Sequence, residues 1–147
     1  MRNNGVLFYK LGSYGLILFT LVHSLSFFSD PAELLTNAED ARVWQLIQTH
    51  VFQIGGLSFT TKKLFTGFNL YLTIFTLFAG VLNILVFRNH FSNTAFLKLM
   101  ATANLVMIGL VWIVTFIFFH LPPLLLFGLS WLLFLFSFIF LGKSSAS

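Results

Sequence analysis

Apolar residues fall in four long stretches that polar and charged residues separate. These stretches cover about residues 11–28, 64–87, 99–120 and 122–141. Each has about the 20 residues that an α-helix needs to cross a hydrocarbon core of roughly 30 Å. Because no Asp, Glu, Lys or Arg interrupts any of them, the pattern predicts an all-α fold. We expect a four-helix transmembrane bundle that forms a single integral membrane domain over residues 1–147.

The long segment between the first two stretches also carries a helical pattern. Asp30-Pro31 resembles an N-cap followed by a proline in the first turn. Farther along, apolar or amphipathic residues recur every three or four positions, which is typical of one helix face. They are Val43, Leu46, Ile47, His50, Val51 and Ile54. We therefore expect an amphipathic helix over about residues 30–54, lying at the outer membrane interface or capping the bundle.

The first stretch also allows the alternative of a cleaved signal peptide, since Ser24-Leu25-Ser26 has the small-x-small pattern of a cleavage site. An uncleaved helix is favoured, because the apolar run continues to Phe28 and its small and polar residues gather on one face. That face comprises Gly12, Gly15, Phe19, His23 and Ser26.

Basic residues next to the stretches predict the orientation in the membrane, because short cytoplasmic segments are rich in Lys and Arg. One side of the membrane would hold Arg2, Lys10, Arg88, Lys98 and Lys143, and the other would hold Arg42, Lys62 and Lys63. The excess predicts that both termini lie on the cytoplasmic side of the membrane.

Composition supports the membrane assignment and excludes several kinds of chemistry. Charged residues make up 8% of the chain and 21 of its 147 residues are Phe, whereas soluble domains carry roughly 25% charged residues. With no cysteine, disulfide exchange and thiolate metal sites are excluded. The positive charges flank apolar segments instead of alternating with aromatic residues, so we expect the lipid bilayer, and not nucleic acid, as the partner.

Polar residues inside the second stretch form one stripe at helical spacing. The stripe comprises Asn69, Thr73, Thr76, Gly80 and Asn83. A weaker stripe on the third stretch comprises Ala101, Asn104, Ile108, Trp112 and Thr115, and Gly128, Trp131 and Leu135 could supply a contact from the fourth. Such residues either pack helices together through small side chains and hydrogen bonds or line a polar cavity or water path. We expect the first three stretches to face one another through these surfaces.

Histidine is the remaining candidate for chemistry, because it ligates metals and moves protons near neutral pH. With the predicted orientation, His23, His50 and His120 belong to the outer side of the membrane and His90 to the inner side. The three outer histidines are candidate ligands of haem, a quinone or a metal. The alternative is that His23 forms a hydrogen bond with Thr20 or a neighbouring helix, while His50 and His120 contact water at the membrane interface. No HExxH or Glu-x-x-His spacing specifies a metal site.

The residue inventory argues against several classes of small membrane protein. Proton-coupled exporters need a buried acid, and all four Asp and Glu lie in the first loop. Quinone-linked disulfide enzymes need paired cysteines, phosphatidyltransferases need clustered aspartates, and glutathione-using membrane transferases need Arg and Glu within their helices. No nucleotide-binding or nucleophile-elbow motif is present either.

Two short motifs carry a family resemblance. The first is Tyr9-Lys10-Leu11-Gly12 followed by Gly15, Phe19 and His23, and the second is Thr66-Gly67-Phe68-Asn69-Leu70. They resemble the opening helix and an element of DoxX-like and related bacterial four-helix membrane proteins. The resemblance implies a bacterial inner-membrane protein with four spans, and some DoxX-type proteins are accessory subunits of quinone-linked oxidoreductases. His23 stands where a basic residue is expected, and no catalytic residue carries over.

The sequence thus predicts a binding or accessory subunit that associates with itself or with other membrane subunits and is not a self-contained enzyme. Two alternatives stay open. One is a redox protein that uses its histidines to bind haem, a quinone or a metal, and the other is a small-solute transporter with its path along the polar stripe.

Overall fold

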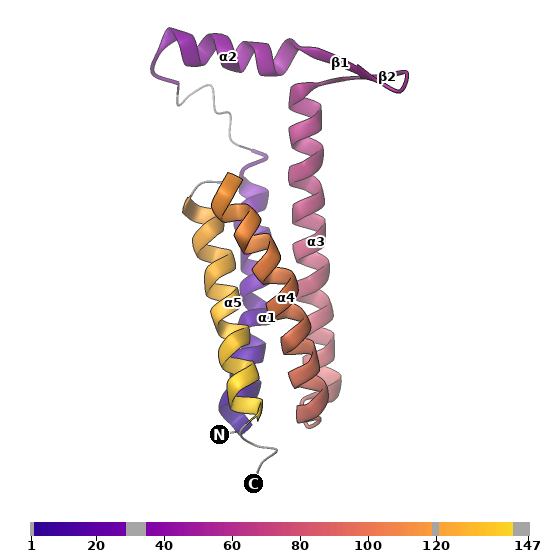
Figure 1. Cartoon of the computed structure of the whole chain (residues 1–147), viewed down its shortest axis with the longest axis vertical. Helices are drawn as coiled ribbons and strands as arrows, with labels where there is room; N and C mark the ends of the chain where they lie inside the picture. The colour runs from indigo at the N-terminus through magenta and orange to yellow at the C-terminus, as the bar shows by residue number, and fades with distance from the viewer. Residues whose placement is uncertain (1, 29–34, 119–120, 143–147) are drawn as a thin grey trace. The chain divides into compact units, whose positions relative to one another are not determined.

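The computed structural model describes residues 2–28, 35–118 and 121–142, and it contains five helices and one β-hairpin in those residues (Figure 1). The elements in chain order are α1 (Arg2–Leu25), α2 (Ala38–Thr49), β1 (Val51–Ile54), β2 (Leu57–Thr60), α3 (Thr61–His90), α4 (Thr94–Phe118) and α5 (Leu121–Gly142).

Four helices are long and apolar enough to cross a membrane, namely Asn4–Leu25 of α1, then α3, α4 and α5. The predicted all-α, four-helix bundle is therefore confirmed, and the chain has the build of a multi-pass membrane protein. The second predicted span lies wholly within α3, and the fourth nearly coincides with α5. The last two residues of the predicted 99–120 span lie outside the described residues.

The first span was placed too far along the chain. The predicted span begins at residue 11, directly after Lys10, but α1 begins at Arg2 and ends at Leu25, before the predicted end at residue 28. Lys10 is compatible with the helix because its side chain is exposed and its ammonium lies 5.7 Å from the centre of the Phe87 ring. At the other end, the Ser26 hydroxyl and backbone N–H both donate to the carbonyl of His23, which closes the helix in a tight turn.

The loop helix is real but shorter than predicted. Asp30-Pro31 lies outside the described residues. The described helix α2 begins after Asn37, whose side chain accepts a hydrogen bond from the backbone N–H of Asp40 at 2.7 Å. This is an N-cap of the ordinary kind, with an acid in the first turn. The helix ends at Thr49, so the predicted continuation to residue 54 was wrong.

Residues 51–54 form a strand because a two-residue turn returns the chain upon itself. Gly55 and Gly56 both have positive φ, +58° and +81°, which a type I′ hairpin turn requires and glycine adopts at little cost. Ile54 pairs with Leu57 beside the turn. Alternation of side chains along the strands places one apolar set on a single face of the hairpin. This hairpin face comprises Phe52, Ile54, Leu57 and Phe59.

The chain divides into two compact units. One, called here the bundle unit, comprises residues 1–22 and 75–147, and the other, the hairpin unit, comprises residues 23–74. Helix α3 contributes its first part to the hairpin unit and its second part to the bundle unit. The expectation of a single domain over residues 1–147 stays a prediction.

Within the bundle unit, α1 and α5 meet through mostly buried residues spaced by three, four or seven positions, as in antiparallel coiled coils. The pairs in contact are Gly5 with Leu141, Gly12 with Phe134, Gly15 with Ser130 and Phe19 with Phe127. A Cβ on Gly5 would lie 2.8 Å from the backbone nitrogen of Leu141, so a glycine is needed for this approach of the two backbones. The hydroxyl of Ser137 then reaches the carbonyl of Gly5 at 2.9 Å.

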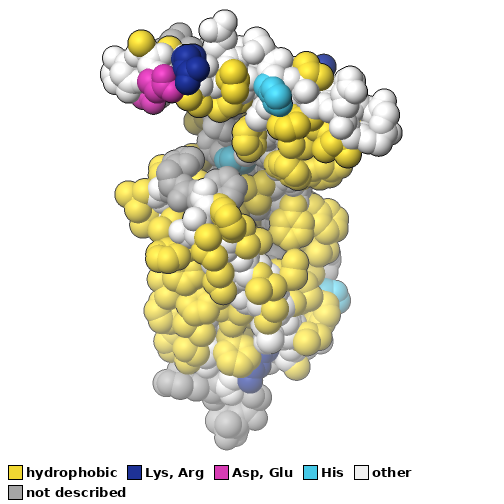
Figure 2. All heavy atoms as spheres, turned by 45° about the horizontal axis from the view of Figure 1, so that its top comes forward, with side chains coloured by type: hydrophobic (Ala, Val, Ile, Leu, Met, Phe, Trp, Pro, Cys, Tyr) yellow, Lys and Arg dark blue, Asp and Glu magenta, His cyan; other side chains and the backbone are white. Residues whose placement is uncertain are grey.

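The four helices of the bundle unit form a closed ring of contacts. Hydrogen bonds link α1 to α3 and α3 to α4, two tryptophans link α4 to α5, and the α5–α1 pairs above complete the circle. Gly12, Gly15 and Phe19, predicted to face the second and third spans, face the fourth span instead. Figure 2 shows one face of this bundle, which is covered mostly by hydrophobic side chains, as contact with lipid requires.

Candidate functional site

The predicted polar stripe runs along α3, and its second part is buried in the bundle unit. Thr76 and Asn83 are almost completely buried there. Gly80 lies between them and allows close contact with α1, since a Cβ at this position would lie 2.6 Å from Cδ1 of Ile17. The first part of the stripe, Asn69 and Thr73, belongs to the hairpin unit, where the Thr73 hydroxyl donates to the carbonyl of Asn69 at 2.8 Å.

The centre of the site is a pair of amides that face each other between α3 and α4. The side-chain nitrogen of Asn83 donates to the side-chain oxygen of Asn104 at 2.8 Å, and the nitrogen of Asn104 donates back at the same distance. The second N–H of each amide donates to a carbonyl of its own helix, at Ala79 and Met100 respectively. All four amide hydrogens thus have acceptors.

Tyr9 joins this pair from α1. Its hydroxyl donates to the side-chain oxygen of Asn83 at 2.5 Å, so that this oxygen accepts two hydrogen bonds, one from α1 and one from α4. The ring of Tyr9 is fully buried and lies edge-on to Phe134 of α5, with 5.6 Å between the ring centres. The side chain of Tyr9 therefore contacts both the Asn83–Asn104 pair and the apolar ring of Phe134 on α5. We call Tyr9, Asn83 and Asn104 the polar triad.

The threonines of the site make simpler contacts. The hydroxyl oxygen of Thr20 lies 3.0 Å from both the carbonyl oxygen of Leu16 and the hydroxyl oxygen of Thr76, so its one hydrogen is shared between these two acceptors, which forms a second polar link between α1 and α3. Thr115, the last candidate on α4, is buried and donates to the carbonyl of Val111 of its own helix.

Every hydrogen-bond donor of the polar triad has an acceptor within the bundle unit. Among the described residues of the bundle unit, no buried side-chain nitrogen or oxygen lacks a hydrogen-bond partner. Amides and a phenol are also weak acids and bases compared with carboxylates and imidazoles. The arrangement suits holding three helices in one register, which buried polar groups can do when every member is bonded.

A second feature of the bundle was predicted only on the α5 side: α4 and α5 bind each other through a repeated pattern, Gly109-Leu-Val-Trp112 and Gly128-Leu-Ser-Trp131. Each Trp ring lies over the glycine of the other helix, and the two rings stack 5.7 Å apart. Each indole N–H donates, at 3.0 Å, to the carbonyl four residues before that glycine, which belongs to Leu124 for Trp112 and to Leu105 for Trp131. The expected contact from Gly128 and Trp131 is thereby confirmed.

This tryptophan pair follows from helix geometry. A side chain in an α-helix leans toward the preceding turn and shields the carbonyl there. At Gly109 and Gly128 no side chain shields it, so an indole from the neighbouring helix can lie flat and reach the carbonyl. The signal in the sequence was the repeated Gly-Leu-x-Trp, spaced so that the two copies oppose each other when α4 and α5 pack antiparallel.

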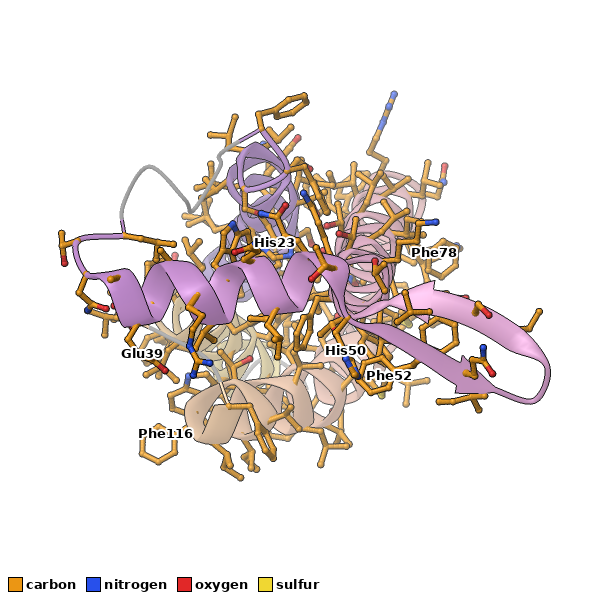
Figure 3. The ribbon with its side chains drawn as sticks, turned by 90° about the horizontal axis from the view of Figure 1, so that it is seen from above. His23, Glu39, His50, Phe52, Phe78 and Phe116 are labelled. Atoms are coloured by element: carbon orange, nitrogen blue, oxygen red, sulfur yellow. The ribbon has the colours of Figure 1, made fainter. Side chains whose placement is uncertain are left out.

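The histidine candidates occupy different settings. His23 lies near the end of α1, half-buried, with its ring 6.1 Å from that of Phe27. His50 is exposed at the junction of α2 and β1, and its ring lies edge-on to Phe52 at 4.7 Å (Figure 3). His120 lies outside the described residues. Within the described part of the chain, no three His, Asp or Glu side chains gather closely enough to share a metal ion.

These observations define a class: a multi-pass membrane protein with a four-helix bundle held by an internal polar triad and a tryptophan pair. No protein-family model, curated protein or solved structure matches the chain. The functional argument therefore rests on the residues themselves.

Proposed function

We propose that the protein is an accessory or binding subunit of a larger assembly in the bacterial inner membrane, with both termini in the cytoplasm, and that it is not an enzyme by itself. The observation that carries the proposal is the polar triad. Its polar groups bond one another, so the bundle uses them to build a rigid scaffold and leaves no acid or base there for chemistry.

The hairpin unit offers the surface through which such a subunit would bind its partner. On the hairpin face, Ile54 and Leu57 at the turn are 63% and 70% exposed. Apolar side chains exposed together outside a membrane span are typical of a binding surface. β2 continues into α3 without a linker, since Thr60 is followed directly by the first helical residue Thr61. A partner that binds the hairpin would thus be tied to a membrane-spanning helix.

The charge distribution supports the proposed orientation. Basic residues concentrate beside the start of α1, the end of α3, the start of α4 and the end of α5, and the four acids lie between the first two spans. That asymmetry is what the positive-inside rule associates with cytoplasmic ends.

Purification in a mild detergent from the native membrane, followed by native mass spectrometry, tests the proposal. We expect a particle heavier than the 16.7 kDa chain that contains a second subunit, or further copies, in fixed ratio. The double variant Ile54→Ser, Leu57→Ser should release the partner while the bundle keeps its melting temperature. Gln53→Ala with Ser58→Ala, on the opposite face of the hairpin, is the matched control and should retain it.

A single chain without a partner in this experiment would contradict the proposal, and so would a double variant that binds as well as the wild type. The absorption spectrum of the same sample addresses the redox alternative, because bound haem would give an intense Soret band. The orientation is tested separately with single cysteines in a chain that has none. Gly55→Cys should react with a membrane-impermeant maleimide in intact cells, and Ser92→Cys only after the membrane is opened.

A further inference from the structure

A groove lies on the surface of the bundle unit between the start of α4 and the end of α5. It has a volume of about 300 Å³ and is lined by Thr94, Ala95, Lys98, Leu99, Thr102 and Leu141. That volume is at the lower end of the range of ligand sites. Its wall combines two kinds of surface, since aliphatic side chains alternate with two hydroxyls and one ammonium. An amphipathic ligand matches such a wall better than a purely polar one.

Among the described residues that line the groove, Lys98 is the only charged one, and its position is defined. Its ammonium lies 4.9 Å from the centre of the Phe138 ring on α5, within the range of a cation–π contact. Among the described residues the salt bridge present is that of Arg42 with Glu39, so Lys98 has no carboxylate partner there. Its positive charge is therefore available to an anion that enters the groove.

The described cations of the bundle unit, Lys10, Arg88 and Lys98, belong to the helix segments at the same end of the bundle as the groove. The antiparallel helices bring the start of α1, the end of α3, the start of α4 and the end of α5 together, as the contacts of Gly5 with Leu141 and of Lys10 with Phe87 show. In sequence, the bundle unit has five Lys or Arg and no Asp or Glu. The field at this end thus attracts anions and repels cations.

The depth of the groove agrees with the headgroup region of a bilayer. Lys98 is the fifth residue of α4, and so lies about 6 Å along the helix axis from its first residue. Leu99 is 63% exposed beside it, on a helix long and apolar enough to cross the membrane. A ligand that places an anionic group on Lys98 would therefore extend its apolar part along Leu99 into the hydrocarbon region.

We propose that this groove binds an anionic phospholipid such as phosphatidylglycerol, with the headgroup phosphate on Lys98 and the hydroxyl of Thr94 and with an acyl chain against Leu99. The lipid would then lie on the start of α4, beside the end of α5, at the cytoplasmic end of the bundle.

Native mass spectrometry of the full chain, with phosphatidylglycerol and phosphatidylcholine of identical acyl chains in competition, tests the proposal. We expect phosphatidylglycerol to be retained in preference by the wild type. Lys98→Gln should lower this preference about fivefold, the contribution of one Lys beside an anionic lipid surface. Lys98→Arg keeps the charge and should keep the preference. Lys62→Gln removes an exposed cation of the hairpin unit and should leave it unchanged.

Three results would overturn the proposal. The first is equal retention of the two lipids by the wild type, and the second is an unchanged preference in Lys98→Gln with the fold verified by circular dichroism. The third is full displacement of the lipid by inorganic phosphate or glycerol 3-phosphate, which would show that the site recognises a free anion and not a lipid. Because the isolated chain is used, a failure here is independent of whether a partner subunit binds the hairpin.

Discussion

In the bundle unit the residues that fix the structure lie far apart in the chain, whereas in the hairpin unit they are neighbours. The hydrogen bond from Tyr9 to Asn83 spans 74 positions and that from Ser137 to Gly5 spans 132. In the hairpin unit, Asn37 caps a helix three residues away, and two adjacent glycines form the turn. Damage to a bundle contact should therefore weaken the whole unit, while damage to a hairpin contact should stay local.

The polar triad should give the largest effect. Asn83→Ala removes the acceptor of Tyr9 and both bonds to Asn104, and it leaves their buried polar groups without partners. We expect the free energy of unfolding in detergent to fall by about 2–4 kcal/mol, measured by SDS titration with circular dichroism. Asn89→Ala is the control, because Asn89 is exposed and bonds only the carbonyl of Leu85 in its own helix. An equal loss of unfolding free energy in both variants would show that the triad does not stabilise the bundle.

The close approach of α1 and α5 should give the next effect. In Gly5→Ala the new Cβ would lie 2.8 Å from backbone and side-chain atoms of Leu141, so the helices must separate. Overpacking of this kind costs about 1–3 kcal/mol. Gly67→Ala makes the same change in the interior of α3 with nothing within 4 Å, and it should stabilise the helix by up to about 1 kcal/mol. We expect the melting temperature to fall in Gly5→Ala and to rise in Gly67→Ala. An unchanged melting temperature in Gly5→Ala would refute the tight contact of α1 with α5.

The tryptophan pair should contribute less. Trp131→Phe keeps an aromatic ring over Gly109 but loses the indole N–H that bonds the carbonyl of Leu105. A loss of about 1 kcal/mol is expected. Trp112→Phe should cost a similar amount, and because the two rings stack, the double variant should deviate from additivity in a double-mutant cycle. Strict additivity would mean that the two rings act independently.

The hairpin turn should show the smallest effect on the bundle. In Gly56→Ala a side chain must adopt φ of +81°, which costs about 1–2 kcal/mol at that residue. Hydrogen exchange should become faster in β1 and β2, while the melting temperature of the bundle stays that of the wild type. If the melting temperature fell as it does in Asn83→Ala, the distinction between the two units would be wrong.

The sequence predicted well those features that depend on residues close together in the chain. Hydropathy identified four spans, and the spacing from Thr76 to Asn83 identified the buried face of α3. Asn104 was assigned to the matching face of α4. Whether the polar residues of the two stripes line a water path, as a transporter would need, stays a prediction, although the bonds of Asn83 and Asn104 to each other favour packing. These residues are Asn69, Thr73, Thr76, Asn83, Asn104 and Thr115.

The missed features depend on partners or on competing local patterns. Tyr9 precedes the predicted first span and was not among the candidate site residues, and only its contact with Asn83 places it in the site. Val51 and Ile54 fit a helix by their spacing and a strand by their residue types. Short apolar runs are ambiguous in this way, and the turn at Gly55-Gly56, flanked by apolar residues on both sides, was the signal that could have resolved it.

By itself, the sequence determined that this chain has four helices long and apolar enough to cross a membrane, because the transfer of a helix into lipid depends on the sum of its own side chains. Only the tertiary structure decided which faces meet. It brought the glycines of α1 against α5, and it joined Tyr9 to an amide pair 74 residues away. It also placed each of two tryptophans over a glycine of the neighbouring helix. A contact between helices is a property of two surfaces together, and in lipid, where burial of apolar surface does not choose between them, close packing and hydrogen bonds make the choice.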